Sequence, residues 1–126
     1  MKTGLNLYPF CPEVRLFHDR EKCANWARKK FGVDIEFIDD VDAQTVTIGS
    51  GTAVVLMEIT DEPVWEDALL VHEAYHIVCE NLRAMRESDA GDEVMAYMIQ
   101  CVAGALMEAH HKWRKKHVNG SDEQDK

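Results

Sequence analysis

The five residues from His72 to His76, with the sequence HEAYH, constrain this chain more than any other stretch. On a helix, residues four apart lie one turn above each other on the same face, so His72 and His76 can direct two imidazole nitrogens at one point. This spacing is typical of zinc ligands, and Glu73 between them is placed to act as a general base without occupying a coordination position. The stretch therefore predicts a helix that carries a metal site.

The residues before this motif have the signals of a helix start. Thr60 or Asp61 can cap the helix, and Pro63 suits its first turn. A mostly apolar stripe follows at helical spacing, and its members are Trp65, Leu69, His72, His76 and Cys79. Because two buried imidazoles are costly unless a partner satisfies them, this stripe favours a bound metal over two hydrogen-bonded core histidines.

A third metal ligand is expected downstream, because a catalytic zinc site usually has three protein ligands. Residues 91–100, GDEVMAYMIQ, predict a second helix, with Asp89 or Asp92 as its cap. Glu93 is the preferred third ligand, with Asp92 and Asp89 behind it. The helix dipole alone also favours an acid in a first turn, and Cys79 is a further candidate ligand near the metal-facing stripe.

Three helices are expected in all. The first spans residues 19–31, with Asp19 as its N-cap and Gly32 ending it. The helix with HEAYH continues to about residue 86, and the last helix runs from Asp92 to about residue 116. The last helix has small residues that would allow it to approach the HEAYH helix closely and bring Glu93 towards the histidines, namely Ala96, Ala103, Gly104 and Ala105.

Three strands are expected in a small antiparallel sheet. Residues 33–38, 44–48 and 52–59 are β-prone, and a Gly-Ser-Gly turn joins the last two. If residues 52–59 form an edge strand beside the metal helix, their unpaired backbone groups would hold an extended peptide across the zinc; an interior strand would not. The predicted fold is α+β, with a single domain at residues 1–120 and a disordered polar tail at 121–126.

Composition bears on partners and location. The chain has 126 residues and a net charge of −9, which argues against binding to nucleic acid or to an anionic membrane. Its start lacks the apolar segment of a signal peptide, and no run approaches the ~18 apolar residues of a membrane span. The four cysteines form no C-x-x-C pair and predict reduced thiols that mostly fill the core. We expect a cytoplasmic protein with a peptide or protein substrate; its oligomeric state is left open.

HEAYH followed by GDEVMAYMIQ resembles the short gluzincin-type metallopeptidases, whose ligands follow a His-Glu-x-x-His…Glu pattern. The likeness is closest to small zinc peptidases encoded by bacteriophages and prophages, which pair this motif with a later E-x-x-A-Y, and it covers about residues 45–106. The resemblance implies a minimal zincin with His72, His76 and Glu93 as zinc ligands, Glu73 as the base and Tyr97 at the aromatic position. The chain is much shorter than a thermolysin-like enzyme, so we expect no second lobe that would form a deep cleft.

These residues predict metal-assisted hydrolysis of a peptide bond. Zn²⁺ would lower the pKa of its water towards ~7 and polarise the carbonyl, while Glu73 would move the proton to the leaving amine. Tyr97, or one of His110, His111 and His117, would donate to the oxyanion; Tyr97 is explained equally well as support for the site or as core. The alternative is an interaction or regulatory protein that binds zinc at a structural His₂Glu site but is catalytically inactive. A third and weaker alternative is a protein that binds no metal.

Overall fold

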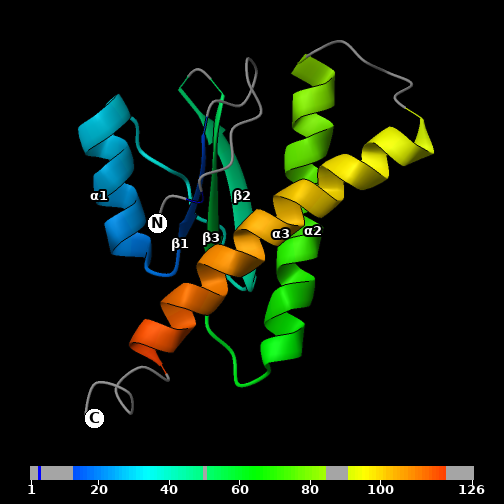
Figure 1. Cartoon of the computed structure of the whole chain (residues 1–126). Coiled ribbons are helices and arrows are strands. Elements are labelled where there is room, and N and C mark those ends of the chain that lie inside the picture. Colours follow the sequence, from blue (N-terminus) through cyan, green and yellow to red (C-terminus); the bar gives the residue numbers. More distant parts are fainter. Residues whose placement is uncertain (1–2, 4–12, 50, 85–90, 119–126) are drawn as a thin grey trace.

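The computed structural model describes residue 3 and residues 13–49, 51–84 and 91–118, and the predicted tail at 121–126 lies outside this part. The fold is α+β, as predicted. A small sheet has α1 on one side and α2 and α3 on the other, with α3 crossing α2 (Figure 1). The elements in chain order are β1 (Val14–Phe17), α1 (Arg20–Phe31), β2 (Ala43–Ile48), β3 (Thr52–Met57), α2 (Pro63–Ala84) and α3 (Asp92–His117).

The sheet is mixed, so the prediction of an antiparallel sheet is wrong. Its strand order is β1-β3-β2, with β2 antiparallel and β1 parallel to β3. A parallel pair needs a crossover connection, and α1 lies on the connection from β1. Sequence reasoning missed β1 because only Val14 and Leu16 alternate as buried residues, over a strand of four residues.

Residues 33–38 were expected to be a strand, and the structure shows none there. The side chain of Gln44 takes the place of a strand partner: it accepts from the amide of Ile38 at 3.0 Å and donates to the carbonyl of Glu36 at 2.8 Å. The apolar residues of this segment, Ile35 and Phe37, pack on the smaller core around Cys23. The alternation in the sequence therefore reflects a loop with one side on a core.

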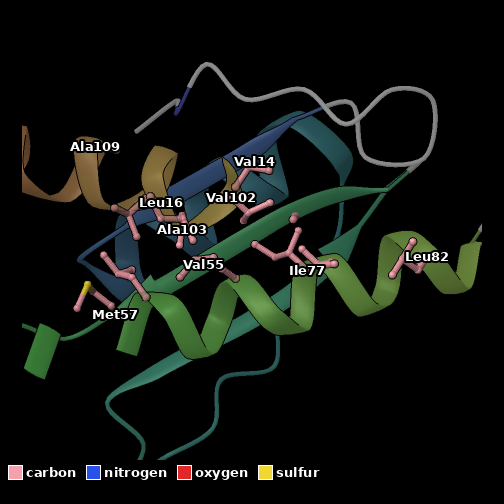
Figure 2. Packing of buried hydrophobic residues seen from close by; sticks show 14 residues of the cluster. Val14, Leu16, Val55, Met57, Ile77, Leu82, Val102, Ala103 and Ala109 are labelled. Carbon is pink, nitrogen blue, oxygen red and sulfur yellow. The ribbon is translucent and has the colours of Figure 1, made fainter. Parts of the chain in front are cut away.

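The larger core lies between the sheet and the pair α2 and α3. Figure 2 shows side chains from all three parts converging in one cluster. Burying these aliphatic side chains is the main force that holds α2 and α3 to the sheet. The members labelled in the figure are Val14, Leu16, Val55, Met57, Ile77, Leu82, Val102, Ala103 and Ala109.

β3 is the central strand, and all six of its residues are buried. Ala53, Val55 and Met57 belong to the larger core, while Val54 and Leu56 belong to the smaller one against α1. Of the two alternatives left open for residues 52–59, an edge strand or an interior strand, the structure shows the interior strand. The edge strand on that side is β2.

α2 buries a different face from the one expected. Its buried apolar residues are Leu70, Ala74, Ile77, Val78 and Leu82, which belong to the larger core. The stripe that begins at Trp65 and contains both motif histidines is largely exposed, Trp65 itself to 48%. The expected burial of the histidines is therefore wrong, because the sheet and α3 cover the neighbouring face of the helix.

The ends of the helices match the sequence signals only in part. Asp19 caps α1 by accepting from the amide of Lys22 at 3.0 Å, and Gly32 ends it in the left-handed region, as predicted. α3 begins after Gly91 with no side-chain cap, so Asp92 is a first-turn residue and not the cap; Asp89 lies outside the described residues. No helix in the described part is long and apolar enough to cross a bilayer.

The cysteines divide between core and surface. Cys23 is buried, and burial raises the pKa of its thiol to about 11, as suits an inert core residue. Cys101 is exposed, so it is not one of the cysteines that fill the core. Cys79 is half-buried, and Cys11 lies outside the described residues.

Candidate metal centre

α2 brings the two motif histidines together. Nε2 of His72 and Nε2 of His76 are 3.1 Å apart, and both side chains are exposed. Two nitrogens bound to one tetrahedral zinc at about 2.05 Å each lie roughly 3.3 Å apart. The 3.1 Å separation is that of a hydrogen bond between the two rings, and it is also close to the separation that a shared metal ion requires. Imidazole nitrogen is a ligand that suits zinc.

A groove with a volume of about 510 Å³ lies beside these histidines. One wall is α2 and the other is the edge strand β2 with the residues before it. The α2 wall consists of His72, Glu73, His76, Cys79, Glu80 and Arg83, and the opposite wall of Ile38, Ala43, Gln44, Thr45 and Thr47. The HEAYH motif thus faces a space that is open to solvent and bordered by a sheet edge.

Glu73 lies at the base of this groove and is only 4% exposed. Its Oε1 accepts a 2.7 Å hydrogen bond from the hydroxyl of Thr45 on β2. Its other carboxylate oxygen has no hydrogen-bond partner in the described part of the chain. One oxygen is therefore held by the sheet while the other remains available to a molecule in the groove.

The expected third ligand is not beside the histidine pair. Glu93 is exposed in the first turn of α3, Asp92 precedes it, and neither lines the groove. Within residues 13–49, 51–84 and 91–118, no group of three His, Cys, Asp or Glu side chains is close enough to hold a metal ion. Tyr97 is 63% exposed on α3, and it too does not line the groove.

One groove residue bears on the alternatives for metal binding. Cys79 lines the groove one turn beyond His76. A hydrogen bond with Cys79 raises the pKa of Tyr75, so the thiol already has a partner on the same helix. Sequence reasoning missed Thr45, because nothing in QTVTI marks one threonine as the partner of a glutamate 28 residues away.

A second polar cluster lies away from the groove, and sequence reasoning missed it as well. Glu66, in the first turn of α2, is fully buried and bonds to His110 at 2.9 Å and to Arg114 at 3.0 Å. His110 also contacts His18, while the exposed His111 pairs with Asp67 at 2.8 Å. The three α3 histidines considered as oxyanion donors, His110, His111 and His117, do not line the groove.

Comparisons with known proteins found no relative. A scan against protein-family models, a search of curated proteins and a search of solved structures each gave no match. The resemblance to gluzincin-type peptidases therefore rests on the motif residues alone.

Proposed function

We propose that this chain is a zinc-dependent peptidase of the gluzincin type, built as a minimal zincin, with Glu73 as its general base. The observation that carries the proposal is that three residues of α2, His72, Glu73 and His76, line the same groove. There His72 and His76 place two nitrogens 3.1 Å apart, with the buried Glu73 between them. Two imidazoles and a carboxylate facing one groove are the side chains that metal-assisted hydrolysis requires.

In this proposal His72, His76 and Glu93 hold the metal. The histidine nitrogens have a suitable separation, whereas Glu93 does not line the groove and is assigned only by its place in the GDEVMAYMIQ segment. A zinc ion bound there would polarise the substrate carbonyl and lower the pKa of the attacking water. Tyr97, one turn after Glu93, is proposed as a donor to the developing oxyanion or as support for Glu93.

Glu73 does the proton chemistry in this mechanism. Thr45 holds Oε1 through its hydroxyl, so the carboxylate keeps one orientation towards the groove. The second oxygen accepts a proton from the attacking water and then passes it to the leaving amine. A base fixed in this way needs no reorientation between the two proton transfers.

The edge strand β2 supports a peptide as the substrate. Among the described strands it pairs only with β3, so its outer edge offers unpaired N–H and C=O groups along the groove. An extended peptide can add to that edge as a further strand, which would lay its backbone beside His72 and His76. The proposed substrate is therefore a peptide or an extended segment of a cytoplasmic protein.

One observation favours a second function, that of a zinc-binding interaction protein without activity. α2 exposes large apolar residues on the stripe next to the histidines, with Val64 83%, Tyr75 49% and Val71 40% exposed. Contiguous exposed apolar side chains are typical of surfaces that bind another protein. In this alternative the metal would stabilise the helix pair and Glu73 would not react.

The two functions are separated by Glu73→Gln, with Glu80→Gln as the matched control on the same helix and in the same groove. Both zinc-loaded variants and the wild type are incubated with a peptide library digested from a bacterial proteome, and cleavage is read by mass spectrometry. A peptidase predicts that Glu73→Gln keeps its zinc but loses about 10²–10⁴-fold in cleavage rate, while Glu80→Gln cleaves normally. Equal cleavage by both variants would contradict the role of Glu73.

A further inference from the structure

Three buried or half-buried side chains, those of Glu66, His110 and His18, form a hydrogen-bonded chain from the start of α2 to the residue before Asp19, the N-cap of α1. At its inner end Glu66 is fully buried, and Oε2 accepts from the Thr60 amide at 2.7 Å and from its hydroxyl at 3.1 Å. Arg114 donates to both carboxylate oxygens at 3.0 and 3.1 Å. Nε2 of His110, which is 1% exposed, lies 2.9 Å from Oε1. A buried carboxylate with these partners is anchored as an anion.

The proton positions along this chain follow from the charge of Glu66. Burial alone would raise the pKa of Glu66, but hydrogen bonds from Thr60 and His110 lower it below its usual value. An ionised carboxylate only accepts, so Nε2 of His110 carries a hydrogen and donates it. Nδ1 of His110 lies 2.9 Å from Nε2 of His18, and in the tautomer in which Nδ1 of His110 carries no hydrogen it accepts one hydrogen bond from Nε2. In that tautomer Nδ1 of His18 carries the lone pair of its ring.

His18 stands where this chain of residues reaches open space. Its ring stacks on Trp113 with centroids 3.8 Å apart, and Trp113 stacks in turn on His117. The ring lines two cavities of about 420 Å³ each; one also contains Phe17, Lys22 and Trp113. Burial lowers the pKa of His18 to about 3, so this imidazole is neutral both at pH 7 and at pH 5.

We propose that His18 is a nucleophilic imidazole that accepts an acyl group from a small activated acyl donor in this cavity, with His110 and Glu66 receiving its proton. Nδ1 forms a bond to the acyl carbon, and the bond from that carbon to the leaving oxygen breaks, with the electron pair departing on the oxygen. The Nε2 proton of His18 moves to Nδ1 of His110. The products are a neutral acyl-His18, an imidazolium beside the Glu66 carboxylate, and an anionic leaving group.

The surroundings of His18 suit this step. The stacked Trp113 fixes the plane of the ring, and Lys22 in the same cavity provides positive charge for a departing anion. Glu66 stabilises the imidazolium that forms on His110, as the third member of a catalytic triad does. The charged and titratable groups around His18 are Glu66, His110 and His117 from α2 and α3, Asp19 and Lys22 around one cavity, and Arg20, Glu21 and Glu58 around the other.

The test uses diethyl pyrocarbonate, an activated acyl donor that reacts with neutral imidazole. The full-length chain is treated at pH 7 and at pH 5 with N-acetylhistidine in the same tube, and peptide mapping by mass spectrometry gives the rate at each histidine. The neutral fraction of an ordinary imidazole falls about 25-fold from pH 7 to pH 5. The proposal predicts that the rate at His18 changes by less than about twofold. A loss at His18 that parallels N-acetylhistidine, or no reaction there at either pH, would overturn it.

Variants separate the proton transfer from simple burial. His110→Asn keeps a polar group near the position of Nδ1 but cannot pass a proton on, and Glu66→Gln removes the charge that stabilises the imidazolium. Each is expected to lower the His18 rate by about tenfold or more. Asp67→Asn is the control, because the Asp67 carboxylate pairs with His111 and is not part of the hydrogen-bonded chain from Glu66 to His18. This variant should leave the rate at His18 unchanged. If Glu66→Gln fails to fold, His110→Asn decides; a wild-type rate in that variant would overturn the proposal.

Discussion

Thr45 Oγ1 donates a 2.7 Å hydrogen bond to Oε1 of Glu73, which ties the edge strand of the sheet to the residue between the two motif histidines. Because Glu73 is 4% exposed, this bond satisfies an oxygen that would otherwise be buried without a partner. The contact sets both the orientation of the proposed base and the position of β2 along one side of the groove.

Removing the hydroxyl at this contact is expected to destabilise the fold. Thr45→Val keeps the shape of the side chain but leaves Oε1 of Glu73 without its donor, so the free energy of unfolding should fall by about 1–3 kcal/mol. Urea denaturation at pH 7 measures the change. Thr45→Ser keeps the hydroxyl and is the control. Val and Ser variants of equal stability would show that the hydrogen bond contributes nothing.

The buried polar cluster should make the protein sensitive to acid. His18 titrates at about 3 in the folded chain against 6.5 ordinarily, so the unfolded chain binds more protons and stability is lost as pH falls from about 6.5 towards 3. The lowered pKa of Glu66 adds a further loss once pH drops below about 4.5. The slope from His18 is at most about 1.4 kcal/mol per pH unit, and less because the ring is partly exposed.

His18→Phe tests this dependence, because phenylalanine keeps an aromatic ring against Trp113 but cannot titrate. Urea denaturation at several pH values between 6.5 and 4.5 should show a flatter slope for this variant than for the wild type. His117→Phe is the control, since His117 also stacks on Trp113 but lies on the exposed side of α3. Identical slopes for His18→Phe and the wild type would refute the assignment.

Replacing either of two glycines by alanine should change the free energy of unfolding, in opposite directions for the two positions. Gly49 has a φ of +59°, and a Cβ there would lie 2.7 Å from Cε1 of Phe31, so Gly49→Ala should lower the free energy of unfolding by about 1–2 kcal/mol. Gly104 lies in α3, and a Cβ added there would meet no atom within 4 Å, so Gly104→Ala should raise that free energy by about 0.5–1 kcal/mol. Thermal unfolding of both variants checks the pair; equal shifts would contradict it.

Much of the fold was predictable where the signal is local. Asp19 and Gly32 mark the two ends of α1, and the Gly-Ser-Gly turn marks the β2–β3 hairpin, because caps and turns depend on neighbouring residues. The parallel pairing of β1 was not predictable, since it joins residues about 40 positions apart. The prediction of a strand at residues 33–38 was wrong because the side chain of Gln44, and not a neighbouring strand, hydrogen-bonds to the backbone of this segment.

The candidate site was predictable only as far as one helix turn specifies it. The spacing of His72 and His76 fixes their shared face whatever surrounds the helix, and the structure places their nitrogens together. Which face of α2 becomes buried depends on how the sheet and α3 pack, and that packing exposed both histidines. The face of α3 that becomes buried was likewise not predictable from the sequence. Ala103 belongs to the larger core that α2 and α3 share, whereas the neighbouring Gly104, also expected to allow close packing of the helices, is exposed.

The most direct test of the account is the zinc content of the full-length chain, purified without a histidine tag and measured by elemental analysis after zinc resupply and dialysis. We predict about one zinc per chain in the wild type and in Glu80→Gln, loss of zinc in His72→Ala and His76→Ala, and weakened binding in Glu93→Gln. A wild-type chain that retains no zinc while its His76→Ala variant folds normally would show that HEAYH is not a metal site, and the proposed peptidase would fail with it.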